Sequence, residues 1–116
     1  MATVHIFAAR GRFSSLEAIR KFVDPTYSED GDCIASLFMR EVSFQTFEPM
    51  CIEAVHSKTA KPLAELLDGA SYCEQWLPSL AASFEADSAV CVFSPNVLLH
   101  PEKSSLRYFG SCSYEH

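Results

Sequence analysis

Apolar and polar residues alternate near the start of the chain, which is the pattern of a half-buried β-strand. Val4 and Ile6 fall on one side of the alternation, and His5 and Phe7 fall on the other. We therefore expect a first strand over residues 3–8. A turn then follows at Gly11, because glycine tolerates backbone conformations that other residues avoid.

Three later segments also have strand character. Residues 50–56 and 105–112 mix apolar and polar positions, whereas residues 89–93 are apolar throughout. A short run that is apolar at every position is typical of a strand buried on both faces. We expect residues 89–93 to be a central strand, and the strand over 105–112 could pair with it as a hairpin.

The first helix is predicted over residues 16–23, where apolar side chains recur at helical spacing. Ser14 and Glu17 have the spacing of a capping box, in which each side chain satisfies a free backbone N–H of the first turn. The pair Asp24-Pro25 should end the helix, since the residue before a proline avoids the helical region. A short second helix is expected after Asp32, which would cap it.

The second half of the chain repeats these signals. Pro62 and Gly69 suit the first position and the end of a short helix. Ser71 and Glu74 form another capping-box pattern, and Trp76 follows on an apolar helical stripe, which favours a place in the core. We expect the regular part of this last helix to run over residues 77–86.

This order of elements predicts an α+β fold for residues 1–116, taken as one domain. The expected architecture is a single mixed or antiparallel sheet of about four strands, with three to four helices packed mainly on one face. The other face would then be free to meet a partner.

Composition narrows the function classes. The 116 residues carry a formal net charge of -6, and 48% of them are hydrophobic, which is typical of one soluble globular domain. A negative charge disfavours nucleic acid as a partner. No apolar run reaches the ~18–20 residues that span a bilayer, and the N-terminus has no signal-peptide pattern, so we expect a cytoplasmic protein without a membrane partner.

The charge is uneven along the chain. Residues 1–23 carry four basic residues and one acidic residue, whereas residues 24–56 carry one basic and seven acidic residues. Such a segment is either a set of solvated loops or an acidic face that meets a basic partner.

Candidate catalytic and metal-binding chemistry is sparse. The five cysteines are odd in number and include no Cys-x-x-Cys pair, and the four histidines have no metal-ligand spacing. The segment 28–32 resembles a calcium loop only superficially, because the carboxylates expected at loop positions 1 and 12 are missing. We expect no cofactor, no metal and no catalytic residue.

A series of short landmarks spans nearly the whole chain, and together they resemble the immunity protein 22 family of bacterial polymorphic toxin systems. In chain order these landmarks are Val4-x-Ile6-Phe7, Tyr27-Ser28-Glu29-Asp30-Gly31-Asp32, Ser36-x-Phe38-Met39-Arg40-Glu41, Leu66-Leu67-x-Gly69-x-Ser71-Tyr72-x-Glu74, the strand 89–93 and Leu106-x-x-Phe109-Gly110-Ser111-x-x-Tyr114. The resemblance implies a cytoplasmic, non-enzymatic protein that binds and neutralises one cognate toxin.

Such toxins are often nucleases, whose basic surfaces hold phosphate. An inhibitor that presents carboxylates would be steered to that surface and would occlude it. Aromatic residues are enriched at the energetic centres of interfaces. The candidate partner-binding residues are Glu29, Asp30, Asp32, Phe47, Glu48, Glu53 and Tyr72. We expect the protein itself to be a monomer or a weak homodimer.

Two alternatives belong to other classes. A compact domain with many aromatic residues could bind a small ligand or act as a regulatory domain, which a deep concavity would favour. An enzyme that uses Cys, His and Asp has only the presence of those residue types in its support, since no nucleophile motif such as Gly-x-Ser-x-Gly occurs.

Overall fold

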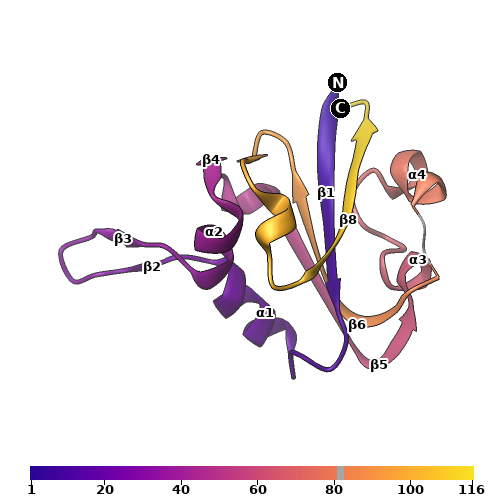
Figure 1. Ribbon diagram of the computed structural model, residues 1–116, viewed down its shortest axis with the longest axis horizontal. Coiled ribbons are helices and arrows are strands. Elements are labelled where there is room, and N and C mark those ends of the chain that lie inside the picture. The colour runs from indigo at the N-terminus through magenta and orange to yellow at the C-terminus, as the bar shows by residue number, and fades with distance from the viewer. Residues whose placement is uncertain (81–82) are drawn as a thin grey trace.

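A computed structural model describes residues 1–80 and 83–116. Its centre is a four-stranded sheet in the order β5 (Ile52–Pro62), β6 (Glu85–Phe93), β1 (Ala2–Ala9), β8 (Arg107–Tyr114). Every neighbouring pair is antiparallel, and Figure 1 shows β1 and β8 side by side with both chain ends at the same end of the sheet. The predicted α+β class with one antiparallel four-stranded sheet is confirmed.

β1 lies between β6 and β8, so the last two strands do not form the hairpin that the sequence suggested. Val4 is opposite Phe93 on one side and opposite Cys112 on the other. β1 carries buried residues at both alternating positions, such as Ile6 and Phe7, and such a strand needs a neighbour on each side and cover on each face. The C-terminal strand supplies the second neighbour.

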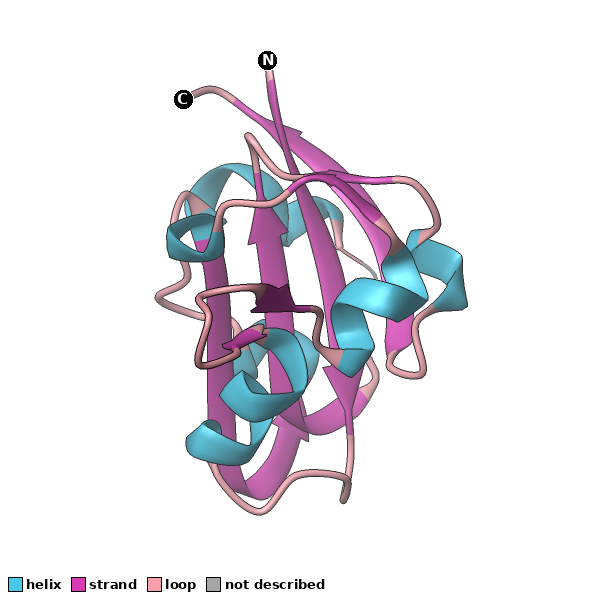
Figure 2. Ribbon diagram, turned by 90° about the vertical axis from the view of Figure 1, so that its left-hand side faces the viewer, coloured by secondary structure: helices cyan, strands magenta, loops and turns pink. Residues whose placement is uncertain are grey.

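Helices cover both faces of this sheet, which corrects the expectation that they would lie mainly on one. α1 (Leu16–Val23) and α2 (Leu37–Val42) lie on one side, and α3 (Leu63–Leu66) and α4 (Cys73–Trp76) lie on the other (Figure 1). Figure 2 looks onto the first side, with helices in front of the strands. The cause is the alternation in β1 and β6, which places apolar side chains on both faces, and both must be buried.

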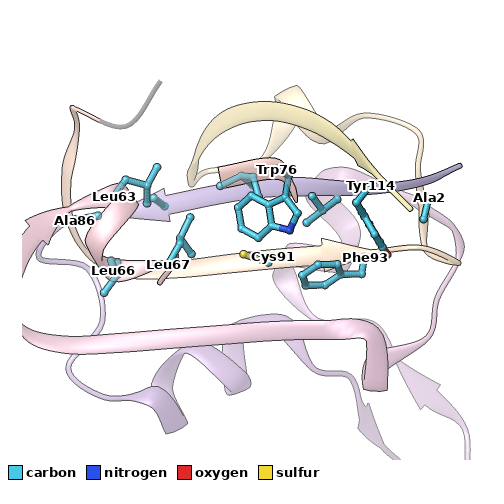
Figure 3. Close-up of a cluster of buried hydrophobic side chains, with 13 residues drawn as sticks. Ala2, Leu63, Leu66, Leu67, Trp76, Ala86, Cys91, Phe93 and Tyr114 are labelled. Atoms are coloured by element: carbon cyan, nitrogen blue, oxygen red, sulfur yellow. The ribbon is translucent and has the colours of Figure 1, made fainter. Parts of the chain in front are cut away.

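The core beneath α3 and α4 is built around Trp76, whose side chain is fully buried as its position on the apolar stripe predicted (Figure 3). Its ring packs edge-on against Phe93 with centroids 6.4 Å apart. The indole Nε1 donates a hydrogen bond of 2.9 Å to the Ser71 carbonyl oxygen, so the polar atom of this large side chain is satisfied.

The core beneath α1 and α2 is aromatic. Phe7 of β1 and Phe38 of α2 are both fully buried and meet edge to face, with centroids 5.1 Å apart. Ile19 and Val23 from α1 close this core from the other helix. The two cores share the sheet as a common wall.

The first two helices are capped by other residues than the sequence predicted. Ser15, not Ser14, caps α1, since its side chain accepts a hydrogen bond of 3.1 Å from the Ala18 N–H. Ser36, not Asp32, caps α2 in the same way through the Met39 N–H. The predicted end of the first helix at the Asp24-Pro25 pair is confirmed.

The predicted helix over residues 77–86 is wrong where the chain is described. α4 ends at Trp76, a short 3-10 turn η2 (Leu77–Ser79) follows, and β6 has already begun at Glu85. Residues 81 and 82 lie outside the described ranges. Pro78 stands inside the 3-10 turn, where its missing N–H costs no helical hydrogen bond.

Smaller elements complete the fold. β2 (Thr26–Tyr27) pairs with β3 (Cys33–Ile34), and β4 (Phe44–Thr46) pairs with β7 (Val97–Leu98). Two further 3-10 turns are η1 (Pro49–Cys51) and η3 (Pro101–Lys103). Within residues 1–80 and 83–116, no helix has both the length and the hydropathy to cross a bilayer.

Candidate functional site

A hairpin projects from the side of the molecule that carries α1 and α2. We call residues 25–35 the hairpin arm; it consists of β2, β3 and the turn between them, and Figure 1 shows it extending away from the sheet. Both strands of the arm are exposed at every residue. The arm is therefore a surface element attached to the core at its base.

Hydrogen bonds close the tip of the arm. The Ser28 N–H donates to the Asp32 carbonyl oxygen at 2.9 Å, and the Gly31 N–H donates to the Ser28 carbonyl oxygen, also at 2.9 Å. The Ser28 hydroxyl accepts from the Asp32 N–H at 3.1 Å. Gly31 adopts a φ of 83°, which glycine reaches without steric cost. The tip thus holds one turn conformation through its own backbone.

Three of the predicted partner-binding residues lie together at this tip. Glu29, Asp30 and Asp32 are all exposed, and residues 25–35 contain no lysine or arginine. Their negative charges are therefore not neutralised within the arm. The sequence predicted a loop here with Asp32 turned back to cap a helix, whereas the structure leaves that carboxylate in solvent.

The arm also exposes apolar side chains that the sequence analysis did not select. Tyr27 is 66% exposed and Ile34 is 52% exposed. The helix expected after Asp32 would have included Ile34 on its buried face, because the spacing of Ile34 to Leu37 and Phe38 is helical. The signal for a hairpin was the turn-forming stretch 28–32 between two residues with high strand propensity.

Glu53 lies elsewhere, on β5, and contacts the chain itself. Its carboxylate accepts hydrogen bonds from both the N–H and the hydroxyl of Ser71, the first at 3.1 Å. Ser71 is thereby tied to β5 and does not form the capping box predicted with Glu74, since no side chain caps α4. Glu53 fixes the segment before α4 on the sheet.

Tyr72 stands beside this pair in an unusual backbone conformation. Its φ of 58° and ψ of 18° are left-handed, a region that non-glycine residues rarely adopt. The half-buried ring stacks on Tyr114 of β8, with centroids 4.8 Å apart and planes at 22°. The stacked ring helps to hold the C-terminal strand against this side of the molecule.

Phe47 and Glu48 lie in the segment between β4 and η1. Phe47 meets Phe44 edge to face at 4.9 Å and packs against the aromatic core. The Glu48 carboxylate caps η1 by accepting from the Met50 N–H at 3.1 Å, while its backbone exchanges two hydrogen bonds with the buried Asn96 side chain. Both residues support the local fold, and neither lies on the arm.

Groups that can carry chemistry are dispersed. Among residues 1–80 and 83–116, no three His, Cys, Asp or Glu side chains gather as metal ligands would. All five cysteines are free, and burial raises the pKa of the Cys91 thiol, which keeps it protonated and unreactive. His56 Nδ1 lies 3.2 Å from the Ser88 hydroxyl, on β5 and β6.

Two hollows on the surface are either small or open. One of about 250 Å³ lies between β5 and α3 beside Leu66 and Cys91, below the ~300–1,000 Å³ of typical ligand pockets. A wider and more open depression of about 690 Å³ lies where the chain ends meet, lined by Met1, Ala2, Ser94, Glu115 and His116. The deep concavity that would favour a small-ligand domain is not present at either place.

The fold is that of a small α+β protein with an acidic hairpin exposed at its side. The family model described as Immunity protein 22 matches residues 4–115. The chain belongs to this family, which confirms the resemblance seen in the sequence. Neither the curated proteins nor the solved structures gave a match. Membership of an immunity family indicates a role in toxin neutralisation and an inhibitor more than an enzyme.

Proposed function

We propose that this protein binds one cognate polymorphic toxin of the nuclease type and neutralises it by covering the toxin's active or substrate-binding surface. The observation that carries the proposal is the family match over residues 4–115, because neutralisation by an immunity protein implies a partner toxin. The protein acts in the cytoplasm as a monomer or weak homodimer, without cofactor, catalysis, nucleic acid or membrane.

Charge supports the nuclease assignment. Nucleases hold the phosphate backbone with basic residues, and this chain carries a net charge of -6 with an acidic, exposed hairpin tip. Opposite surface charges accelerate encounter and fix the orientation of docking. The primary contacts in this proposal are Glu29, Asp30 and Asp32.

The remaining candidates occupy other places on the surface. Phe47 and Glu48 precede η1, Glu53 lies at the start of β5, and Tyr72 directly precedes α4. Their side chains already have partners inside the chain. Contact of these four residues with the toxin stays a prediction, and mapping the interface of the complex tests it together with the primary contacts.

Co-expression with a neighbouring toxin gene is the direct test. We expect cells that express the toxin domain encoded beside this chain's gene to survive only when this chain is present, and the two proteins to co-purify. A toxin domain from an unrelated system serves as the control and should remain lethal. Survival without a complex, or a complex without survival, would contradict neutralisation by binding.

The class of the toxin is read separately. Plasmid DNA and total RNA are incubated with the purified toxin domain, with and without an equimolar amount of this protein. We expect one of the two nucleic acids to be degraded and the degradation to stop when the protein is added. A toxin domain that kills but leaves both intact would show that the partner is not a nuclease.

A further inference from the structure

The hairpin arm is uncovered on both of its faces. Thr26 pairs with Ile34 and Tyr27 pairs with Cys33, and residues opposite each other on antiparallel strands share a face. Tyr27 and Cys33 therefore lie on one face of the ribbon, and Thr26 and Ile34 lie on the other. All four are exposed, so each face presents one large apolar side chain to solvent.

Such a ribbon lacks its own stabilising layer. A two-stranded hairpin is marginally stable in water, and stability normally comes from a third strand or from packing of an apolar face. In this protein the turn is closed by the bonds around Ser28, and the base continues into α1 and α2. The conformation of the arm is therefore fixed before a partner binds, while the side chains of Tyr27 and Ile34 remain exposed to solvent.

We infer that the hairpin arm inserts into a cleft of the toxin that contacts both faces of the ribbon, with Tyr27 and Ile34 as the residues that supply most of its affinity. This inference rests on the proposed function. Tyrosine is enriched among the few residues that dominate the binding energy of interfaces, and burial of the isoleucine removes further apolar area from water. The acidic tip leads into the cleft, so the cleft carries basic residues at its deep end.

Charge selects a toxin over a second copy of this chain as the occupant. Each arm carries Glu29, Asp30 and Asp32 and no lysine or arginine, so two arms brought together would both be negatively charged, and like charges at close range oppose association. A basic cleft meets the tip with the opposite sign. The shape agrees, since a narrow arm that is exposed on two faces fits a cleft better than a flat surface.

The experiment measures binding of the purified full chain to the toxin domain encoded beside its gene. In the apolar variant, Tyr27→Ser with Ile34→Thr, we expect the Kd to rise by roughly 30-fold or more, chiefly through faster dissociation. In the tip variant, Glu29→Gln with Asp30→Asn and Asp32→Asn, we expect association about 10-fold slower at low salt, and a smaller difference as salt is added.

Matched controls separate position from composition. Met50→Ser with Val97→Thr removes two exposed apolar side chains outside the arm, and Glu65→Gln with Asp68→Asn and Glu74→Gln removes three exposed carboxylates on the α3 and α4 side. Both controls should bind as the wild type does. Amide hydrogen exchange should slow within residues 26–34 when the toxin is added. Circular dichroism confirms that each variant is folded.

The outcomes distinguish this inference from the proposed function. If the wild type binds and the apolar variant binds equally well, or if amide hydrogen exchange at residues 26–34 is unchanged, the arm is not inserted, although the proposed neutralisation of the toxin still holds. An equal loss of affinity in the apolar variant and in its control, Met50→Ser with Val97→Thr, would also overturn the inference. If the wild type does not bind the toxin domain at all, the proposed function fails and this inference fails with it.

Discussion

His5 lies on the central strand β1 with its ring Nδ1 2.9 Å from the Tyr108 hydroxyl on β8. Burial lowers the pKa of this histidine below its ordinary value of 6.5, because the charged imidazolium would lose its hydration. Burial likewise raises the pKa of Tyr108. The pair is therefore neutral in the folded protein, and it links two strands that are far apart in the sequence.

This pKa shift predicts how stability depends on pH. Below pH 6.5 the unfolded chain binds a proton at His5 that the folded protein does not bind until the pH reaches its lower folded pKa. The free energy of unfolding should therefore fall as the pH is lowered from about 7.5 to about 5.5. Urea titrations across this range, with His5→Gln for comparison, provide the measurement; an equal slope in the variant would contradict the assignment.

Single residues also show where local patterns mislead. Ser71 and Glu74 have the spacing of a capping box, yet Ser71 bonds to Glu53, eighteen positions earlier in the chain. The left-handed backbone at Tyr72 turns the segment away from the geometry that a cap requires. Residue spacing indicates only contacts between neighbours in sequence. It therefore cannot predict that the distant Glu53 carboxylate accepts the hydrogen bonds of Ser71. The core position of Trp76 was predictable because burial follows from its own apolar stripe.

At the scale of elements, the junction of α1 and α2 depends on one serine. The Ser36 hydroxyl accepts from the Met39 N–H at 3.1 Å and donates to the Val23 carbonyl oxygen at 2.7 Å, in a buried setting. It therefore caps the start of α2 and satisfies the end of α1 with the same oxygen. The base of the hairpin arm lies between these two helices in sequence, so the same bond holds the arm's two ends together.

Replacement of Ser36 by alanine should destabilise the protein by about 2 kcal/mol, because a cap is lost and a buried carbonyl loses its partner. Chemical unfolding followed by circular dichroism measures the change. Ser14→Ala is the matched control, since Ser14 is exposed and Ser15 provides the cap of α1; it should change stability by less than about 0.5 kcal/mol. Equal effects of the two variants would refute the role of Ser36.

The strands were more predictable than the helices at this scale. Alternation in residues 3–8 and the apolar run 89–93 are properties of the strands themselves, and β1 and β6 appear there. The expected helix over 77–86 was apolar at helical spacing, but its chain had to return to the sheet at Glu85, and strand pairing outweighed local periodicity. The hairpin was missed because Ile34 also fits the helical spacing of α2.

At the scale of the whole molecule, one sheet separates two cores. Trp76 reports the core on the α3 and α4 side, and Phe7 and Phe38 belong to the other. Because β1 and β6 contribute side chains to both cores, unfolding of one core removes the sheet against which the other core packs. The sequence indicated the number of main strands but not their order, since order depends on pairings between distant segments. The predicted free face was wrong because β1 and β6 place apolar side chains on both faces of the sheet.

The shared wall predicts a single cooperative unfolding transition. Trp76 is the only tryptophan, so its fluorescence follows one core, while far-UV circular dichroism follows the whole chain. We expect both signals to give the same urea midpoint, as a two-state protein requires. The variant Phe38→Ala, on the opposite side of the sheet from Trp76, should lower both midpoints together. A tryptophan midpoint that stays in place would show that the cores unfold separately.

The central position of β1 sets the timing of folding during synthesis. The Thr3 N–H donates a hydrogen bond to the Ser94 hydroxyl, ninety-one positions later. His5 Nδ1 lies 2.9 Å from the Tyr108 hydroxyl, one hundred and three positions later. β1 therefore cannot pair with both of its neighbours until residues 107–114 have emerged from the ribosome. Closing such long loops before any reward from pairing makes folding slow for a protein of this size. Under the proposed function, the toxin is neutralised only after β8 has been synthesised and paired with β1, which favours production of this protein ahead of its toxin.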